Sequence, residues 1–389
     1  MALGHVHPLT SAHAHPPRTR PTATLQSVSD DYLPYQMWDT VQAFCSTVTG
    51  MLAAKAMLTG MGVGNDTASV GAALWQATVR RNIGKVARIA FVTFKGADLD
   101  DNAKFWRIVA DVLNDLALAI ELVSPALCPA VGDCNAEWAY FAAVSAAETF
   151  RAVVGVAGGA TRAALTQHFA LRDNFGDVNA KDGSQEVFVE ILGSTVGMYI
   201  VHTCHTKTAA WIAFCILTCC HIAANVMACA AVELASFNRQ RAHLVASAWA
   251  SQGLVLSPKS AAALEQVLYF GGSGVRGAQI VIGARLEQLL SCGADNLFSQ
   301  LSSARQRPYV ILVSGAVSPV KVFVGLRRGA AVRDILQAYI HAHLTAAAVT
   351  KREPLPDHNN LSRLVDQLEG HGWRLDSLHI SLAGPLLEW

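Results

Sequence analysis

The sequence predicts a mainly α-helical, membrane-associated domain followed by a small α+β module at the C-terminus. Three observations lead to this fold class. Hydrophobic residues make up 52% of the 389 residues and charged residues only 15%, whereas soluble domains carry about 25% charged residues. An apolar run over 209–231 contains no Asp, Glu, Lys or Arg. From about Arg307 onward, short β-rich runs alternate with turn residues and helical stretches.

The charge balance and the cysteines exclude several other classes of protein. The formal net charge is +1, so no overall electrostatic field recruits nucleic acid. The apolar content excludes disorder over most of the chain. The nine cysteines show no repeated disulfide-like spacing, which fits a reducing compartment. Cys128 and Cys134 lack the close spacing and the second pair of a zinc site, so we expect no metal centre.

Residues 1–29 read as a tail outside the folded part of the chain. They contain no Asp or Glu, two Arg and several Ser and Thr. Prolines such as Pro8 and Pro21 oppose a stable helix there. This composition fits an organelle transit peptide, plastid or mitochondrial, and it fits a disordered tail equally well. We therefore expect a membrane location and leave the organelle open.

Residues 30–250 form the expected helical membrane domain. The run 209–231 is long enough for a span, since about 20 apolar residues cross the hydrocarbon layer. The apolar run 187–201 precedes it, interrupted by Glu190, and Lys207 lies between the two runs. The pair predicts a helical hairpin in the membrane. A buried helix pair in a soluble core is the alternative.

Two further segments are weaker candidates for membrane helices. The segment 41–63 is rich in Ala, Gly and Met but contains Lys55. Its Gly50 and Ala54 have the four-residue spacing that lets helix backbones approach closely in lipid. The segment 113–131 is the weakest candidate because it contains carboxylates and prolines.

The sequence pattern changes in the C-terminal part of the chain. Residues 251–306 read as a helical connector, and residues 307–389 as the α+β module on the water side of the membrane. Gly and Pro punctuation separates its expected elements. These are strands at 308–314, 320–326 and 378–382, and helices at 331–347 and 361–370.

One helical stretch carries a polar face. At about 100° per residue, Asp111, Asn114, Asp115 and Glu121 fall on the same side. They predict a polar cavity or cation path, because ionisable groups buried in a membrane are usually functional. The alternative is a helix at the membrane surface with this face in water.

A glycine-rich stretch over 155–164 is a second candidate site. We expect its glycines to precede a helix, so that backbone N–H groups at Gly158, Gly159 and Thr161 hold an anion with help from Arg162. It matches neither the dinucleotide fingerprint nor the P-loop. Close packing through small residues is the alternative reading of the glycines.

The polar stretch 177–186 contains the third candidate, Lys181. This lysine can neutralise a phosphate or, if desolvated, act as an amine nucleophile. Alternatively, the stretch caps the next helix through Ser184. No Ser/His/Asp or Cys/His set for nucleophilic catalysis stands out, so we do not expect an enzyme.

Five motifs stand in order along the chain: 31–39 (DYLPYQMWD), 60–64 (GMGVG), 110–115 (ADVLND), 155–162 (GVAGGATR) and 177–185 (DVNAKDGSQ). In this order they resemble the root UVB sensitive (RUS) family, also described as vitamin B6 photo-protection and homoeostasis proteins. The likeness covers about 30–250, with a weaker match through the C-terminal module. The stretches 128–149 and 386–389 diverge.

The resemblance implies a membrane protein acting in vitamin B6 homeostasis, tied in plants to ultraviolet-B responses and auxin transport. It implies association with family paralogues or a second copy, contact with membrane lipid, and a plastid location for some members. It carries over no catalytic residues and no certain cofactor. Pyridoxal phosphate is the expected ligand, with the glycine-rich stretch holding its phosphate and Lys181 meeting its aldehyde.

Two functions remain open on this basis. The first is a protein that binds or moves a B6 vitamer or related small anion. The second is a membrane scaffold that recruits a partner protein through its C-terminal module. Arg239 and Arg241 follow the last apolar run, so the positive-inside rule predicts that this module faces the cytosol, stroma or matrix.

Overall fold

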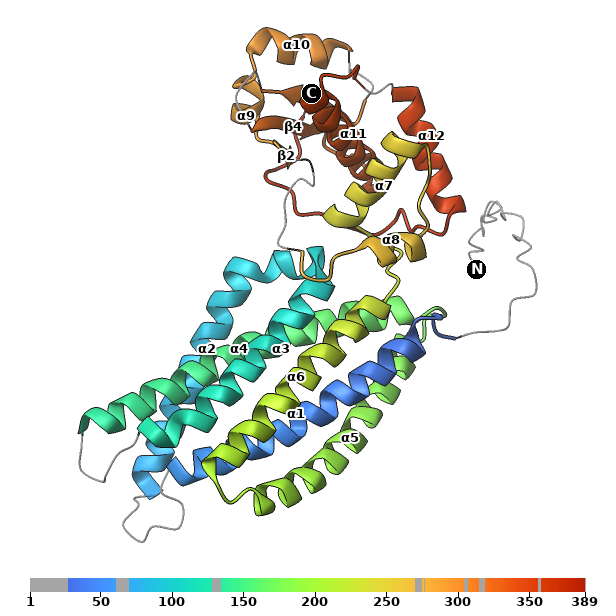
Figure 1. Cartoon of the computed structure of the whole chain (residues 1–389). Coiled ribbons are helices and arrows are strands. Elements are labelled where there is room, and N and C mark those ends of the chain that lie inside the picture. Colours follow the sequence, from blue (N-terminus) through green and yellow to red (C-terminus); the bar gives the residue numbers. More distant parts are fainter. Residues whose placement is uncertain are drawn as a thin grey trace, which may run out of the picture.

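The computed structural model has two lobes, a bundle of long helices and a smaller lobe of helices and short strands (Figure 1). The expected tail at 1–29 lies almost entirely outside the described residues, as do Cys128 and most of the 60–64 stretch. The structure describes residues 27–60, 70–127, 134–269, 275, 277–303, 307–314, 319–355 and 358–388.

The first lobe is built from antiparallel helices. α1 lies between α5 and α6 in Figure 1 and packs on both, while α3 packs on α4 and α1. Both helices of the predicted hairpin are present as α5 and α6, but they do not pack as a pair, because α1 lies between them and each packs mainly on α1. The elements are α1 (Tyr32–Gly60), α2 (Val70–Asp101), α3 (Ala103–Val123), the 3₁₀ helix η1 (Ser124–Leu127), α4 (Cys134–Phe169), α5 (Phe175–Thr203) and α6 (Lys207–Ala231).

Among the described residues, three helices are long and apolar enough to cross a membrane, over Tyr32–Thr59, Trp138–Phe169 and Lys207–Ala231. The first and third correspond to the predicted segments 41–63 and 209–231. The second was missed, because the glycine-rich stretch in α4 was read as a break. The apolar part of α5 is not among the three. It is about 22 Å long as a helix, which is short of the ~30 Å hydrocarbon core.

Each of the three apolar helices has one end beside the second lobe. The start of α1 and the ends of α4 and α6 meet beside the second lobe, where Tyr35, Phe169 and Val232 pack in one cluster. The rings of Tyr35 and Phe169 are 5.0 Å apart. The opposite ends of these helices therefore lie together at the far end of the bundle.

Close backbone approach occurs on α5 and not at the predicted place. A Cβ added at Gly193 would lie 2.9 Å from Thr47 Cβ, and one at Gly197 would lie 2.8 Å from Met51 Cγ. These glycines, four residues apart, let α5 pack tightly on α1. The prediction for Gly50 is wrong, because nothing lies within 4 Å of a Cβ built there.

The second lobe confirms the predicted α+β module. Its main sheet has the order β2-β4-β3, with β2 parallel and β3 antiparallel to β4, and one core runs from Phe237 to Ile380. The stretch 251–306, expected to be helical, also contains β2. The elements are β1 (Phe237–Asn238), α7 (Arg239–Gln252), α8 (Pro258–Leu264), β2 (Ala278–Ile282), α9 (Leu286–Leu290), α10 (Ala294–Ser303), β3 (Tyr309–Val313), β4 (Val320–Leu326), α11 (Val332–Lys351), α12 (His358–Gly370) and β5 (Leu378–His379).

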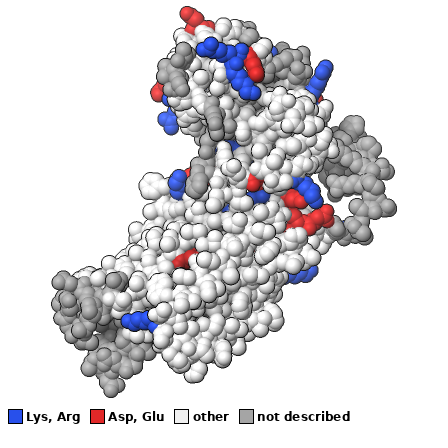
Figure 2. All heavy atoms as spheres, in the orientation of Figure 1, with Lys and Arg blue, Asp and Glu red and all other residues white. Residues whose placement is uncertain are grey.

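The two lobes differ in surface chemistry. Most of the visible face of the helical lobe is uncharged in Figure 2, whereas charged atoms gather at the junction of the lobes and on the α+β lobe. Exposed apolar side chains such as Phe188, Ile191 and Ile216 contribute to the helical surface. This distribution is typical of a bundle whose outer surface faces something less polar than water.

Candidate functional site

The polar face of α3 points into the bundle. Asp111, Asp115 and Glu121 are 8%, 5% and 3% exposed, and α1, α4 and α6 pack around them. The surface-helix alternative is therefore wrong for this face. Burying three carboxylates demands partners, because an unpaired buried charge is costly.

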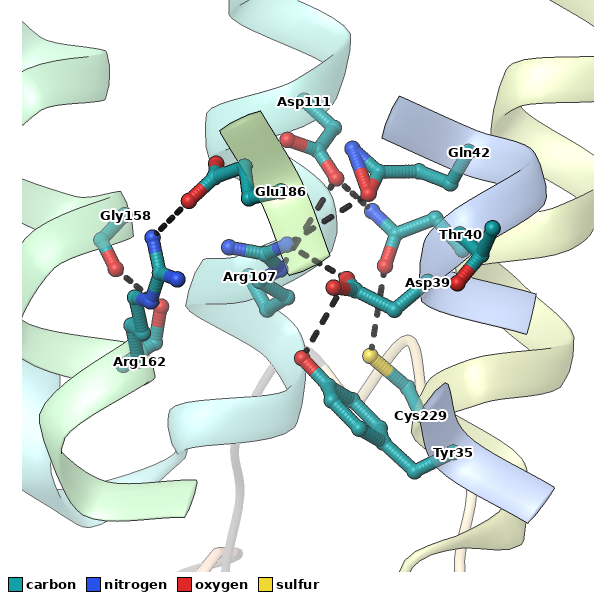
Figure 3. A network of polar contacts seen from close by, with 12 residues as sticks. Tyr35, Asp39, Thr40, Gln42, Arg107, Asp111, Gly158, Arg162, Glu186 and Cys229 are labelled. Carbon is teal, nitrogen blue, oxygen red and sulfur yellow. Dashed lines mark hydrogen bonds and ion pairs between the residues drawn. The ribbon is translucent and has the colours of Figure 1, made fainter. Parts of the chain in front are cut away.

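Arg107 supplies the central counter-charge (Figure 3). Its Nη2 donates to Asp39 Oδ1 at 2.9 Å and to Gln42 Oε1 at 3.5 Å. Its Nε lies 4.0 Å from Asp111 Oδ2. Tyr35 adds a hydroxyl that donates to Asp39 at 3.4 Å. The guanidinium thus joins α3 to α1 inside the bundle.

The next turns continue the network through α6. Asp111 accepts a hydrogen bond from Asn225. His221 Nδ1 lies 2.8 Å from Asp115 Oδ2, and its Nε2 lies 3.1 Å from Gln42 Nε2. Because the Gln42 amide nitrogen only donates, His221 Nε2 accepts and Nδ1–H donates to Asp115.

These contacts define a polar column that runs along the bundle axis. Among the described residues, Asp115 Oδ1 is buried without a hydrogen-bond partner. Asn114, the fourth predicted residue, lies beside the column and donates to Ser46 Oγ at 3.2 Å. The polar column consists of Asp39, Gln42, Arg107, Asp111, Asp115, His221 and Asn225.

Glu121 belongs to a separate ion pair. Arg151 of α4 donates to Glu121 Oε2 at 2.6 Å, and Ser124 caps the end of α3 through the Glu121 carbonyl. The predicted face is therefore brought together along one helix, but its last carboxylate faces α4. The polar column ends at Asp115.

An apolar layer closes the polar column toward the far end of the bundle. Ala53, Leu118 and Phe214 form a buried cluster there. Beyond this layer lies a cavity of about 350 Å³ between α1, η1 and the start of α6. We call it the cationic cavity, because Lys55, His205 and Lys207 line it together with Thr206, Trp211 and apolar side chains, and no carboxylate is among its described lining residues.

Helix ends shape the polar side of the cationic cavity. Lys55 Nζ donates to the carbonyls of Val201 at 2.8 Å and Cys204 at 3.3 Å, at the end of α5. Thr206 caps α6 by accepting from the Ala209 N–H. The first turn of α6 and its Lys207 therefore face the cavity with positive charge. A small anion with an aromatic ring matches this lining and volume.

The glycine-rich stretch does not form the predicted anion site. Gly158, Gly159 and Thr161 lie inside α4, so their N–H groups face helical carbonyls and not a ligand. Alanines on both sides favour helix over the expected turn. Nothing lies within 4 Å of a Cβ built at Gly158 or Gly159, so the packing alternative also fails there.

Arg162 is already paired. Its Nε and Nη2 donate to Asp182 Oδ2 at 2.9 and 2.6 Å, and its Nη1 donates to Glu186. Figure 3 shows the guanidinium turned toward Glu186 of α5. Asp182 also accepts from Gln36 Nε2 at 2.6 Å. Arg162 therefore ties α4 to α5 and α1.

Lys181 lies apart from this cluster on the surface of α5. Its side chain is 71% exposed and its Nζ lies 2.8 Å from Asp177 Oδ2. That hydrogen bond raises the pKa of Lys181, the opposite of the shift that a Schiff-base amine needs. Ser184 does not cap the helix, since it lies within α5 and donates to the Ala180 carbonyl. The predicted pairing of Lys181 with Arg162 is therefore not assembled.

Only Asp111 and Asp115 of the seven residues in the polar column were predicted from the sequence. His221 and Asn225 lie four residues apart in the uncharged run 209–231, and Asp39 and Gln42 lie three apart in α1. Such spacings place each pair on one helix face. Two polar side chains on one face of an apolar helix were the pattern from which these residues could have been predicted.

The fold and the site define a class: a helical bundle with three apolar helices, a buried polar column and an appended α+β module. Comparison with known proteins identifies its family. Residues 21–253 match the vitamin B6 photo-protection and homoeostasis domain. Residues 254–382 match the root UVB sensitive protein C-terminal domain. The chain belongs to the root UVB sensitive family, as its motifs predicted.

Individual relatives support the same assignment. "RUS family member 1" of Dictyostelium discoideum is 40% identical over 254 residues, covering 64% of this chain and 46% of that protein. "Protein root UVB sensitive 3" of Arabidopsis thaliana is 32% identical over 380 residues, covering 93% and 82%. "Protein root UVB sensitive 2, chloroplastic" is 27% identical over 250 residues, covering 64% and 55%. No solved structure matches the chain.

Proposed function

We propose that this protein lies in a membrane and acts in vitamin B6 homeostasis by binding and moving a small phosphorylated ligand. The observation that carries the proposal is an order of three layers along the bundle. The cationic cavity opens at the far end, the apolar layer follows, and the polar column continues toward the α+β lobe. Membrane proteins that move solutes need such a binding site and a barrier beside it.

The membrane location is supported by the three aligned apolar helices and the largely uncharged face of the helical lobe. Ionisable residues within such helices are rare and mark solute or proton pathways. For the compartment we propose an organelle membrane, since residues 1–29 lack acidic side chains and one relative is named chloroplastic.

The ligand that suits the cationic cavity is pyridoxal phosphate. Lys55 and Lys207 would meet the phosphate, and the N–H groups of Lys207 and Thr208, which precede the capped Ala209, would add donors. Trp211 offers an aromatic face for the pyridine ring. The family domain, described by vitamin B6 photo-protection and homoeostasis, supports a vitamer over other small anions.

The polar column suits proton movement more than anion movement, because carboxylates outnumber its one arginine. Chains of carboxylates and histidines serve as proton relays in membrane proteins. Asp115 Oδ1 has no hydrogen-bond partner among the described residues, so this oxygen is the one that would accept a proton. Ligand movement is therefore coupled to protonation of the Asp115–His221 pair.

Uptake of pyridoxal phosphate into proteoliposomes tests this function. Uptake by the wild-type chain should rise with an imposed proton gradient. Asp115→Asn should remove that response, and Phe214→Ala, which thins the apolar layer, should raise the basal leak. Asn114→Ala, beside the polar column, is the matched control and should leave the gradient response intact. Vesicles in which the wild-type chain gives no uptake above empty vesicles contradict the proposal.

A second candidate function is favoured by the α+β lobe. One edge of its main sheet is left open by the described residues, in a groove between two helices. A scaffold that recruits a partner protein through this lobe needs no small ligand. Failure of uptake together with loss of function when the lobe is disrupted supports the scaffold.

A further inference from the structure

One edge of strand β3 is unpaired among the described residues. It pairs with β4 on one side, with Val310 opposite Gly325 and Leu312 opposite Phe323. Ser314 N–H donates to the Lys321 carbonyl, and the Pro308 carbonyl accepts from Arg327. In an antiparallel ladder the bonded positions alternate, so 308, 310, 312 and 314 bond to β4. The N–H and C=O groups of Ile311 and Val313 therefore point away from the sheet.

The opposite edge of the same sheet is covered at one end of β2. Ala383 N–H donates to the Ile282 carbonyl at 2.8 Å, and a Cβ at Gly283 would meet Leu382 Cβ at 3.0 Å. The C-terminal segment thus lies along the end of β2. For Ile311 and Val313, no described segment provides a comparable backbone bond. The two edges of this sheet therefore differ: a described segment bonds to the end of β2, and none bonds to the outward backbone groups of Ile311 and Val313.

A groove of about 320 Å³ follows the free edge, and all five residues of β3 line it. α11 packs on one face of the sheet and α10 on the other, so the edge forms the floor between them. A segment that lies on this floor is flanked by α11 on one side and by α10 on the other. The groove therefore suits one extended segment.

The sequence of β3 leaves the edge attractive for pairing. Tyr309–Val313 has no charge, proline or bulge, the devices that usually block an edge strand. Arg307 lines one end of the groove, and no carboxylate is among its described lining residues. A segment with an acidic side chain near that end complements the charge.

We propose that this groove, which we call the β3 groove, binds an extended peptide segment of another protein by strand addition to β3. The inference rests on the second function proposed above. Alternate residues of the segment bond to Ile311 and Val313, and the residues between them place side chains toward α10 or α11. An acidic residue of the segment pairs with Arg307.

Selection from random peptides of about ten residues, the upper length of ordinary strands, tests the proposal. The full chain in detergent is the bait, and the Ile311→Pro variant is used for counter-selection. Proline at 311 removes no bond to β4, because that N–H points outward, and an unchanged thermal unfolding temperature verifies the fold. We expect enrichment of β-branched sequences with one Asp or Glu. Ile311→Pro should weaken their binding about tenfold or more, equivalent to ~1.4 kcal/mol.

A charge exchange separates the groove from other surfaces. Arg307→Glu should weaken the selected peptides, and replacing their acidic residue by Lys should restore binding to that variant. Arg328→Glu, at an exposed arginine outside the lining of the β3 groove, should leave binding unchanged. No enrichment, or equal binding to wild type and Ile311→Pro, overturns the proposal. So does a concentration-dependent dimer that Ile311→Pro dissolves, since a second copy would then occupy the edge.

Complementation of a null mutant tests the scaffold function and the β3 groove separately. Loss of function in the Ile311→Pro and Arg307→Glu variants, with both folded, supports the β3 groove as the recruiting site. If Ile311→Pro and Arg307→Glu restore function fully although neither variant binds the selected peptides, the β3 groove is overturned as the recruiting site and the scaffold function is left to another surface of the lobe.

Discussion

Lys104 of α3 and Glu265 at the end of α8 form a buried ion pair across the two lobes, with Nζ and Oε2 2.7 Å apart and both side chains 2% exposed. Arg241 of α7 holds the other carboxylate oxygen at 2.7 Å. Lys104 also donates to the Val232 carbonyl at 2.7 Å, at the end of α6. Burial raises the pKa of Glu265, but Arg241 and Lys104 outweigh it and lower the pKa overall.

The first prediction follows from this pair. Glu265→Gln leaves two buried cations without a counter-charge, so we expect a loss of about 3–5 kcal/mol in the free energy of unfolding. Chemical denaturation in detergent measures it. Glu369→Gln, at an exposed position on α12, is the control and should change stability little. Equal stability of both variants would show that the lobes do not depend on this pair.

A second prediction concerns acid stability of the α+β lobe. Burial, reinforced by the adjacent His243, lowers the pKa of His343 to about 3, against about 6.5 in an unfolded chain. The unfolded state thus binds more protons between these values. The contribution of His343 to stability is complete above about pH 6.5 and is lost as pH falls toward 3, at up to about 1.4 kcal/mol per pH unit.

Unfolding curves at several pH values measure this dependence. His343→Leu should flatten the dependence below pH 6.5. His371→Gln, at an exposed histidine of the same lobe, should not. The assignment fails if the wild-type and His343→Leu curves run parallel through this range.

A third prediction compares two glycines in the helical lobe. Gly193→Ala would bring a Cβ within 2.9 Å of Thr47 Cβ, so it should force α5 away from α1 and destabilise the bundle. Gly158→Ala meets nothing within 4 Å and lies inside α4. It should stabilise the helix by up to about 1 kcal/mol. Thermal unfolding measures both, and the same sign for both changes would contradict the packing.

The sequence predicted what local patterns determine. The run 209–231 and the polar face of α3 follow from spacing along one helix, and both are present. The partners of that face could not be predicted, because Asp115–His221 joins residues far apart in the chain. The prediction from local sequence was wrong where neighbouring helix-forming residues outweighed a glycine-rich composition. Glycines at 155–159 were read as a turn, yet they lie within α4.

The candidate site in the structure differs from the predicted one, also because of contacts between distant parts of the chain. Arg162 was predicted to be free for a phosphate, but long-range contacts with Asp182 and Glu186 neutralise it. Lys181 could act as an amine nucleophile only if desolvated, but the helical register of α5 turns it outward beside Asp177. The cationic cavity depends on helix ends brought together by the fold, and no single segment of sequence carries its signature.

Equilibrium binding of pyridoxal phosphate to the full chain in detergent tests the central claim most directly. Lys207→Ala should weaken binding about tenfold or more, since a hydrogen bond to a charged group contributes about 1.5–3 kcal/mol. The change should not weaken α6, because alanine favours the helix and a cation at its first turn opposes the dipole. Lys181→Ala, at an exposed lysine outside the cavity lining, should bind like wild type. Absence of wild-type binding, or a loss in Lys181→Ala with none in Lys207→Ala, would contradict the account.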